Sequence, residues 1–561
     1  MDDETLKEFQ ELFDFDIAKK DVILKKIITN DIITGKKIDI SPDVYKDTNI
    51  NNWGTDIPTL EGSKLLIKKL IENPINDKIL LLKRQKAFID YDIDINILKE
   101  YENDILWIYK ISDEINENSS IEILFPSSFI LCYINYFEQL LDSYHLYKIF
   151  FIPMTSILYP ISTFCAPYFY LKNYMKMDIS ISSYISTMYS VIKLLLQTTG
   201  NIKQDIFKYI GFFIYTGVYL YNMYQTFEVA SFLYKTKMQL HEKMEGLVYF
   251  VKHSINIIKN IDKNILDPFF IIDKNFDDLE INNSMTDIYR IWKSESIKNK
   301  ISSLLKTIYG VDVVYSLNNL LLSGKWSMPE YNNIETKLWD AKNPLLNMYQ
   351  VSNPVNLNKN IIVTGPNAGG KTTYVKTILS NIILGQSIGI TYSLKSKLIL
   401  YDTINSFMRV SDELGNRSYF EAEAEYCLNM IKKAKEINSI NKKGLFLMDE
   451  PMHSTPPTEG MATAYSVIEY LSKIEGISLI ITTHFHKLIE LEEKYPNKFI
   501  NLSVDAILDP KSNKYIFPYK IKYGHSYLCI AIELLDIKDF PKEIINNAIK
   551  IKNKIYYDFN K

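Results

Sequence analysis

The pattern of hydrophobic and polar positions changes twice along the 561 residues of the chain. Residues 1–52 are charged and only weakly periodic, and they predict two short helices, over 4–13 and 22–28. From Leu60 onward, leucines recur at helical spacing. Residues 228–261 predict one long amphipathic helix, because apolar side chains recur there every three, four and seven positions. The chain up to this point therefore favours a mainly helical fold.

Past Pro329 short β-branched runs alternate with helical segments. Such alternation is typical of a parallel α/β domain. We expect strands at 361–364, 444–449 and 479–483, and a helix with its exit over 374–390. The pattern predicts four consecutive segments: a short N-terminal segment (1–52), a helical region (53–325), an α/β domain (326–552) and a tail (553–561). The helical region has a very hydrophobic centre at 121–227.

Composition narrows the function classes. With 47% apolar and 23% charged residues, the chain is an ordinary globular protein with room for three or four domains of about 150 residues. A net charge of −3 gives no overall attraction to nucleic acid, so any DNA contact must come from a local patch. The four cysteines lie far apart and the seven histidines lack metal-ligand spacing. This usage argues against disulfides and zinc and predicts an intracellular protein, in the cytoplasm or nucleus.

Two long uncharged runs stand in the hydrophobic centre, one of 23 residues at 149–171 and one of 19 at 209–227. Both reach the roughly 20 residues needed to cross a bilayer. Three prolines interrupt the first run, and Asn222 and Gln225 dilute the second. A buried helical core and a membrane-associated hairpin both remain open. Neither interpretation supplies the Lys and Arg density of a DNA-gripping surface.

The strongest chemical signal is the run GPNAGGKT, which fits the pattern G-x-x-x-x-G-K-[ST] at all eight positions. It follows an apolar run and precedes a predicted helix, as a phosphate-binding P-loop does. Glycines let backbone N–H groups and a helix N-terminus face a phosphate chain, while the lysine reaches the outer phosphates. The chain is therefore predicted to bind a nucleoside triphosphate through these residues: Gly365, Pro366, Asn367, Ala368, Gly369, Gly370, Lys371, Thr372 and Thr373.

Two later strands end in side chains that suit phosphate chemistry. The first ends in Asp449 and Glu450, and the second is followed by His484. An Asp at that place, with the Thr372 hydroxyl, can hold Mg²⁺, and the next Glu can orient or deprotonate an attacking water. His484 would face the γ-phosphate. We predict Glu450 and His484 as catalytic residues and Thr372 and Asp449 as metal ligands. The order of strands and polar residues resembles that of ABC-class ATPases.

Further motifs indicate one branch of that class. The ABC signature LSGGQ is absent, and the chain carries RSYFEAE at 417–423, DEPMHSTPPTEG at 449–460 and YGHSY at 523–527. With the P-loop these resemble the MutS family of DNA mismatch-repair ATPases, over roughly 53–92 and 300–552. The resemblance implies an ABC-class α/β P-loop ATPase domain with a mostly parallel sheet at the C-terminus, preceded by a mainly α-helical core-lever region.

The resemblance also implies cofactors and partners. ATP and Mg²⁺ would bind in a homodimer, or in a heterodimer with another MutS-like subunit, and Ser418 would reach the γ-phosphate held by the partner. The adenine pocket would contain Asn353, Pro354 and Tyr519. ATP hydrolysis would drive a clamp on double-stranded DNA in repair or recombination. Pro451, His453 and a Pro-Pro pair replace the glycine, arginine and small hydroxyl residues of the family, which stiffens the loop expected at the dimer interface.

Mismatch recognition in full-length relatives uses an N-terminal domain with a Phe-x-Glu wedge. Only about 50 residues precede the core-lever segment here, which is at the bottom of the domain size range. Residues 9–11 spell Phe-Gln-Glu, but on a short predicted helix. We therefore expect a truncated member that lacks the mismatch-recognition domain and has no strong preference for mismatches. The alternative is an ATP-gated scaffold that acts at a membrane or on RNA and ribosomes.

Overall fold

The computed structural model describes residues 17–90, 93–114, 124–198, 202–274, 276, 278–408, 419–454, 456–509, 515–528, 531–538 and 540–559. The predicted helix over 4–13, the Phe-Gln-Glu run and Ser418 lie outside these residues. The chain forms two compact units. The helical unit comprises 1–27, 96–256 and 274–304, and the sheet unit comprises 28–95, 257–273 and 305–561. The predicted borders at 52 and 325 do not coincide with the borders of these units.

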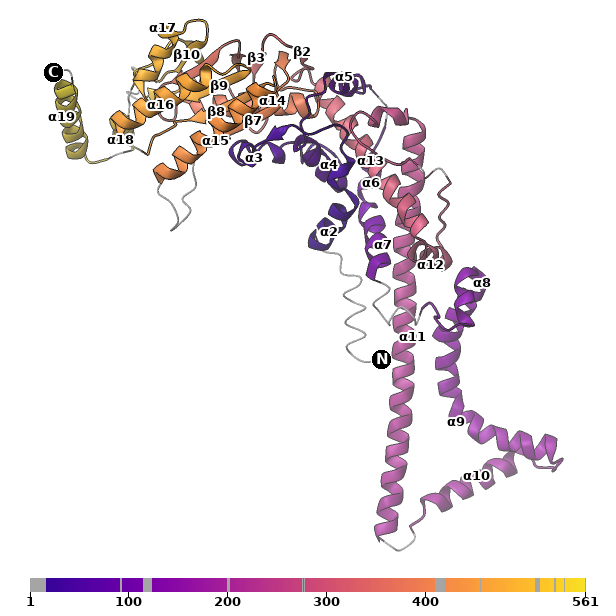
Figure 1. The fold of residues 1–561 in the computed structure, drawn as a ribbon. Helices are drawn as coiled ribbons and strands as arrows, with labels where there is room; N and C mark the ends of the chain where they lie inside the picture. Colours follow the sequence, from indigo (N-terminus) through magenta and orange to yellow (C-terminus); the bar gives the residue numbers. More distant parts are fainter. Residues whose placement is uncertain are drawn as a thin grey trace. The chain divides into compact units, whose positions relative to one another are not determined.

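A seven-stranded sheet forms the centre of the sheet unit (Figure 1). All neighbouring strands run parallel except the last pair, which is antiparallel. Every position of β5 and β7 is buried, as expected for parallel strands covered on both faces. The strand order is β1 (Asp39–Ile40), β7 (Thr403–Phe407), β8 (Gly444–Asp449), β9 (Ile477–Thr482), β5 (Asn360–Thr364), β10 (Phe499–Val504) and β13 (Ile521–Tyr523).

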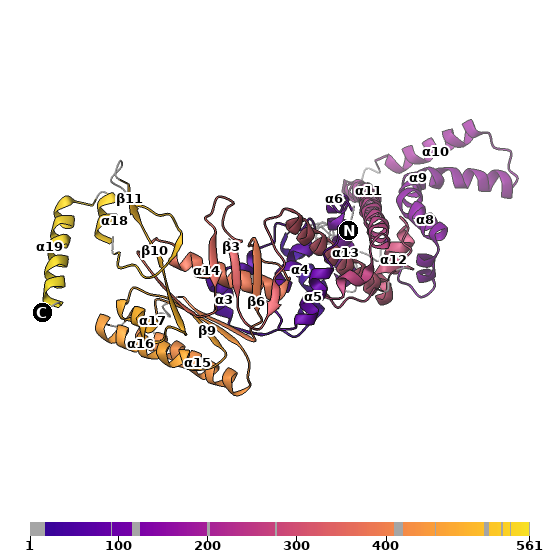
Figure 2. The ribbon, with the colours of Figure 1, turned by 90° about the horizontal axis from the view of Figure 1, so that it is seen from above.

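Helices cover this sheet. Figure 2 shows α15 (Tyr419–Ser439) and α16 (Pro457–Ser472) along one face. Their apolar side chains pack with those of the central strands in one buried cluster, which includes Met430, Ile468 and Phe446. Helix α14 (Lys371–Ser387) packs against α3 (Pro42–Thr48) and α4 (Glu61–Ile71). The predicted strands and the helix after the first of them are confirmed within a few residues.

Two smaller sheets complete this unit. One has four strands in the order β2 (Glu330–Asn332), β6 (Lys395–Ile399), β3 (Lys337–Ala341) and β4 (Asn353–Asn356). The other pairs β11 (Ile507–Leu508) with β12 (Tyr515–Ile516). The C-terminal helices are α18 (Ala531–Ile537) and α19 (Lys542–Phe559).

The N-terminal part of the sheet unit is bound firmly to the central sheet. Strand β1 pairs with β7. Arg84, on α5 (Lys78–Lys86), is fully buried and donates hydrogen bonds to the carbonyls of Thr34 (2.7 Å) and Pro268 (2.9 Å) and to that of Ser387 at the end of α14. A buried guanidinium is stable only when such acceptors surround it. Residues 28–95 are therefore built into the fold that carries the sheet.

The helical unit contains one very long helix. Helix α11 runs from Ile202 to Lys259, so the predicted start at residue 228 is wrong. The apolar run at 209–227 contains no proline, and the helix continues through it without a break. Helix α13 (Glu295–Leu322) contributes to both units. The other described α-helices of the helical unit are α2 (Ile17–Ile27), α6 (Asn96–Lys99), α7 (Glu102–Glu114), α8 (Glu138–Leu146), α9 (Ile152–Phe169), α10 (Ile181–Leu196) and α12 (Met285–Lys293).

The apolar run at 149–171 is helical but is not the core of the helical unit. Of the 18 residues of α9, only Pro153 and Tyr168 are buried. The interpretation as a buried helical core is therefore wrong for this segment. In the part of the chain that the structure describes, one helical run, Glu138–Tyr174, is long and apolar enough to cross a membrane, by length and composition only, and one such helix is weak evidence.

Candidate functional site

The loop from Gly365 to Gly370 joins the buried strand β5 to the first turn of α14. Three residues in it have a positive φ: Gly365 (134°), Ala368 (66°) and Gly370 (97°). A Cβ atom on Gly365 would lie 2.2 Å from the carbonyl oxygen of Val504. Only glycine fits there, so the backbone turns tightly and α14 begins at Lys371 with its N-terminus exposed to the cavity beyond.

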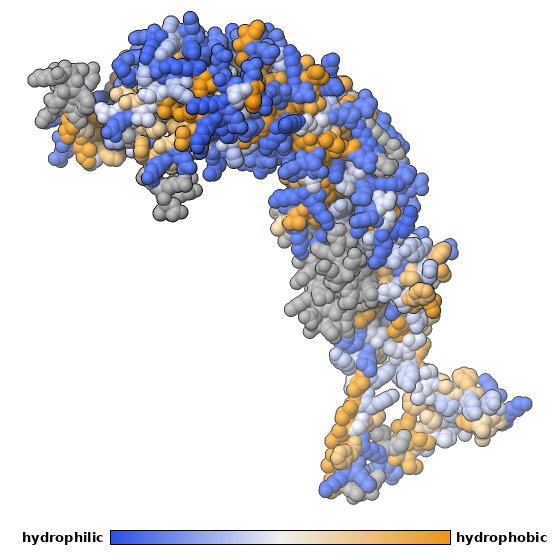
Figure 3. All heavy atoms as spheres, viewed as in Figure 1, coloured by the Kyte–Doolittle hydropathy of each residue, from blue (hydrophilic) through white to orange (hydrophobic). Residues whose placement is uncertain are grey.

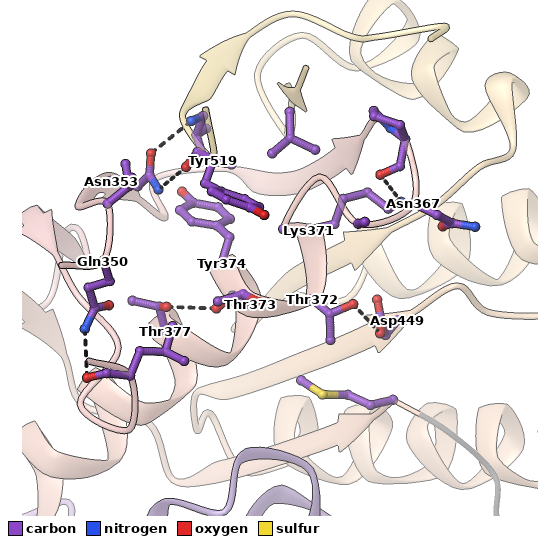
Figure 4. Close-up of a pocket in the computed structure, with 18 of the residues that line it drawn as sticks. Gln350, Asn353, Asn367, Lys371, Thr372, Thr373, Tyr374, Thr377, Asp449 and Tyr519 are labelled. Carbon is purple, nitrogen blue, oxygen red and sulfur yellow. Dashed lines mark hydrogen bonds between the residues drawn. The ribbon is translucent and has the colours of Figure 1, made fainter. Parts of the chain in front are cut away.

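That cavity has a volume of about 1010 Å³, which suits a nucleotide (Figure 4). Its lining includes loop residues, the start of α14, the ends of β7 and β8, and the segment before β4. Among the predicted residues, the lining contains Asn353, Pro366, Asn367, Ala368, Gly370, Lys371, Thr372, Thr373, Asp449, Glu450 and Tyr519.

Asp449 and Thr372 lie together at one edge of the cavity. Strand β8 neighbours β9, so Asp449 stands beside Thr482 at the carboxyl ends of the two strands. The Thr372 hydroxyl donates to one oxygen of the Asp449 carboxylate at 3.0 Å, and the Thr482 hydroxyl donates to the other. A carboxylate and a hydroxyl side by side fit the few protein ligands that Mg²⁺ takes when it also binds phosphate and water.

Glu450 follows directly in a left-handed backbone conformation, with φ of 54°. Its N–H donates to the Thr482 carbonyl at 3.0 Å, which fixes the turn. Its Oε1 lies 2.8 Å from His484 Nε2 and 3.7 Å from Lys371 Nζ. The hydrogen bond from His484, followed by the positive charges nearby, lowers the pKa of Glu450 to about 2. The carboxylate is therefore ionised at any physiological pH.

Lys371 is buried, and its ammonium is held in place. Nζ donates to the carbonyls of Gly365 (2.9 Å) and Pro366 (3.4 Å) and lies 3.1 Å from His484 Nε2. The same histidine nitrogen lies 2.7 Å from Asn367 Oδ1. The loop, Lys371, Glu450 and His484 thus form one connected polar group. A cation so placed at a helix N-terminus suits the outer phosphates of a nucleotide.

The predicted adenine pocket lies at the other side of the cavity. In Figure 4 the ring of Tyr519 lies between Asn353 and Lys371. The Asn353 amide donates to the Tyr519 carbonyl at 2.9 Å, and its oxygen accepts from the N–H of Ile521 at 2.9 Å. Asn353 thus holds the Tyr519 segment in place, and both the nitrogen and the oxygen of its side-chain amide are hydrogen-bonded. Pro354 is not in the lining, and its carbonyl accepts from the buried Tyr374 hydroxyl at 3.0 Å.

Sequence reasoning missed several residues of the cavity. Gln350 lines it and pins the backbone of Asn343, with a 2.7 Å hydrogen bond to the Asn343 N–H and another to its carbonyl. Glu423, also in the lining, accepts a hydrogen bond from the Ser454 hydroxyl at 2.5 Å. Met408 and His453 line the cavity as well. Glu423 and His453 lie in the 417–423 and 449–460 motifs but were given no role in the cavity. No local motif marks Gln350 and Met408, which only the fold brings to the nucleotide cavity.

Ser418 cannot be placed, because it lies outside the described residues. Helix α15 begins with Tyr419, the residue after it. The bond between Glu423 and Ser454 joins the first turns of α15 to the loop after β8. The signature segment and the loop expected at a dimer interface are therefore connected within one chain.

Residues 361–556, which contain most of this site, match the family model of MutS domain V. This segment is a MutS domain V. The resemblance read from the sequence is thereby confirmed for the C-terminal part of the chain, as is the combination of a mainly helical region with a mostly parallel sheet. The roles of single residues in this domain V stay predictions.

Curated relatives agree with the match. The chain is 27% identical over 281 residues to the DNA mismatch repair protein MutS of Fusobacterium nucleatum, with 48% of this chain and 30% of the relative covered. It is 24% identical over 269 residues to the MutS of Oceanobacillus iheyensis, covering 46% and 30%. The MutS of Finegoldia magna is 29% identical over 194 residues, covering 35% and 22%. The chain thus spans less than a third of the length of these relatives. Their names give no support for a membrane partner.

Proposed function

We propose that this chain binds ATP with Mg²⁺ in the cavity of its MutS domain V and hydrolyses it. The observation that carries the proposal is the convergence of four side chains from three elements. Lys371 begins α14, Asp449 ends β8 and is followed by Glu450, and His484 follows β9. Glu450 lies within 4 Å of both the lysine and the histidine. Chains that only bind a nucleotide do not need all four.

Each side chain has a role that its surroundings support. Lys371 and the N–H groups of the loop would hold the phosphates. Thr372 and Asp449 would hold Mg²⁺, which supplies charge neutralisation when it is bound. Within the described residues no three His, Cys, Asp or Glu side chains could hold a metal without other ligands, so phosphate oxygens and water would complete the shell.

Glu450 would orient the attacking water. Its pKa of about 2 makes it a weak base, so its main contribution is a fixed negative acceptor for the water's hydrogens. His484, which donates to Glu450 here, would turn to the γ-phosphate when a nucleotide enters. Tyr519, held by Asn353 and half exposed, offers a face on which adenine can stack.

We also propose a dimer, homodimeric or with another MutS-like subunit, in which Ser418 completes the site of the partner. Mixing Lys371→Ala with Ser418→Ala protein tests this. Equal mixing is expected to restore about a quarter of the wild-type ATPase turnover, since half of randomly paired dimers are mixed and each has one complete site. A mixture that stays as inactive as each variant alone, with both proteins folded, would contradict a site shared between subunits.

We further propose that the chain acts on double-stranded DNA inside the cell, as the names of the relatives suggest, with little preference for mismatches. Binding is expected to rest on phosphate contacts and to fall steeply with added salt. A mismatch preference below about threefold is expected. A strong preference would require a wedge side chain whose contacts offset the cost of unstacking bases. Titrating matched and single-mismatch duplexes at two salt concentrations measures both. A preference of roughly tenfold that survives the higher salt would contradict this expectation.

A further inference from the structure

The helical unit exposes a large apolar surface over α9, α10 and the first half of α11. In Figure 3 hydrophobic residues lie among paler ones at this end of the unit. Phe151, Phe164, Phe213 and Ile214 are 45% to 72% exposed, and they lie in the runs 149–171 and 209–227, which contain no charged residue. Monomeric proteins rarely expose contiguous apolar patches of more than a few hundred Å², so this surface requires a cover.

The apolar residues occupy all sides of the helices. Ile157, Leu158 and Tyr159 follow one another in α9 and are 46%, 41% and 60% exposed. Successive helical residues point about 100° apart, so these three alone face most of the helix circumference. A partner protein would cover one stripe, whereas a helix that is apolar all round is surrounded by a core or by lipid.

The Ser and Thr hydroxyls of α9 are satisfied without water. All four Ser and Thr hydroxyls of α9 donate to carbonyls of their own helix, at 2.7 to 2.8 Å. Pro160 has no N–H, so it cannot pair with the carbonyl of Ser156 one turn earlier. The Tyr219 hydroxyl of α11 donates to that carbonyl at 2.6 Å. Lipid tolerates proline in a helix where a neighbouring helix satisfies the freed carbonyl in this way.

The segment that carries the two apolar runs begins and ends at one place in the helical unit. Asp142, before the first apolar run, forms an ion pair with Lys237, after the second, at 2.7 Å. Both ends must therefore lie on the same side of any bilayer, so the number of crossings is even. The run at 149–171 lies in the one described helical run that is apolar enough for a span. The run at 209–227 has the length of a span and contacts the first run through the Tyr219 hydroxyl, whereas α10 has 16 residues and carries Lys193.

We propose that residues 149–227 insert into a lipid bilayer as a hairpin with two spans, 149–171 and 209–227, and that α10 lies at the far surface. Lys148, Lys172 and Lys208 stand at the ends of the spans, where their ammonium groups can reach the headgroups. In α10, Ser183, Ser186 and Ser190 recur at helical spacing and give it the polar face that a surface helix needs. The domain V match begins at residue 361, so this inference does not depend on the proposed ATPase function.

Flotation of the full chain with phosphatidylcholine vesicles tests the insertion. The protein is expected to float with the vesicles and to stay bound after a carbonate wash. The double variant Leu158→Asp/Val218→Asp, with one charge in the middle of each span, is expected to reduce the floated fraction roughly tenfold or more. The matched control Val22→Asp/Ile79→Asp changes side chains that are 67% and 69% exposed outside the hairpin, and it is expected to float like the wild type.

Trypsin treatment of sealed vesicles tests the crossing with the unmodified protein. In molecules whose domain V faces outward, Lys172 and Lys176 are expected to be protected until detergent is added. The insertion is refuted if the wild type stays at the bottom of the gradient, if carbonate removes it, or if the charged double variant floats like its control. Equal cleavage at Lys172 in intact and dissolved vesicles refutes the two spans. A far-UV circular dichroism spectrum of the double variant in detergent that matches the wild type shows that any loss of flotation does not come from unfolding.

Discussion

Lys371→Ala is expected to weaken ATP binding by about 100-fold or more. The ammonium of Lys371 is buried and held at the N-terminus of α14, where the outer phosphates would lie. A hydrogen bond between charged groups contributes up to about 3 kcal/mol, and 1.4 kcal/mol corresponds to a factor of ten in affinity. The dissociation constant of a fluorescent ATP analogue measures the effect.

Lys359→Ala is the matched control for this variant. Lys359 stands just before β5, at the opposite end of the strand from the loop, and its ammonium bonds to the carbonyl of Pro496. The substitution removes the same charge at a distance from the cavity, so it is expected to leave the affinity for the ATP analogue unchanged. If Lys371→Ala binds the analogue within threefold of the wild type, the phosphates do not lie at the start of α14.

Glu450→Gln is expected to leave ATP binding intact and to lower the steady-state hydrolysis rate by roughly 10² to 10³-fold. Glutamine keeps the size of the side chain but removes the negative charge that orients water. The exposed Glu475→Gln is the control, since it makes the same change in a turn before β9. Hydrolysis by Glu450→Gln at the parental rate would assign the water-activating role to another residue.

The lowered pKa of Glu450 also predicts how the effect of this substitution on turnover depends on pH. A carboxyl group with a depressed pKa keeps its charge above that pKa and loses it only as the pH falls through it. With a pKa of about 2, Glu450 stays ionised from pH 8 down to pH 5. The ratio of wild-type to Glu450→Gln turnover should therefore stay constant over that range, and a ratio that collapses near pH 6 would show that Glu450 titrates there.

The sequence predicts the parts of the site that local patterns encode. Glycines at fixed spacing, an apolar run ending in Asp449 and Glu450, and another run before His484 identify three strand ends. Parallel strands bring their carboxyl ends to one edge of the sheet, so the meeting of these residues follows from the pattern. Side chains that reach the cavity from segments without a motif, such as Gln350 and Met408, could not be predicted in the same way.

Long-range pairing explains the other differences. Strand β1 has only two residues and pairs with β7 far along the chain, so no periodicity reveals it. Arg84 looks like an ordinary charged residue at the end of a short helix, yet three carbonyls from distant segments surround it. The predicted start of α11 is too late because a change from an apolar run to an amphipathic pattern does not end a helix.

Equilibrium binding of radiolabelled ATP to the intact chain, with and without Mg²⁺, tests the central claim most directly. The account predicts saturable binding of one ATP per chain, stronger with Mg²⁺, competed by ADP and lost in Lys371→Ala. Absence of saturable binding up to about 1 mM ATP, or binding that Lys371→Ala leaves unchanged, would contradict a nucleotide site in this cavity.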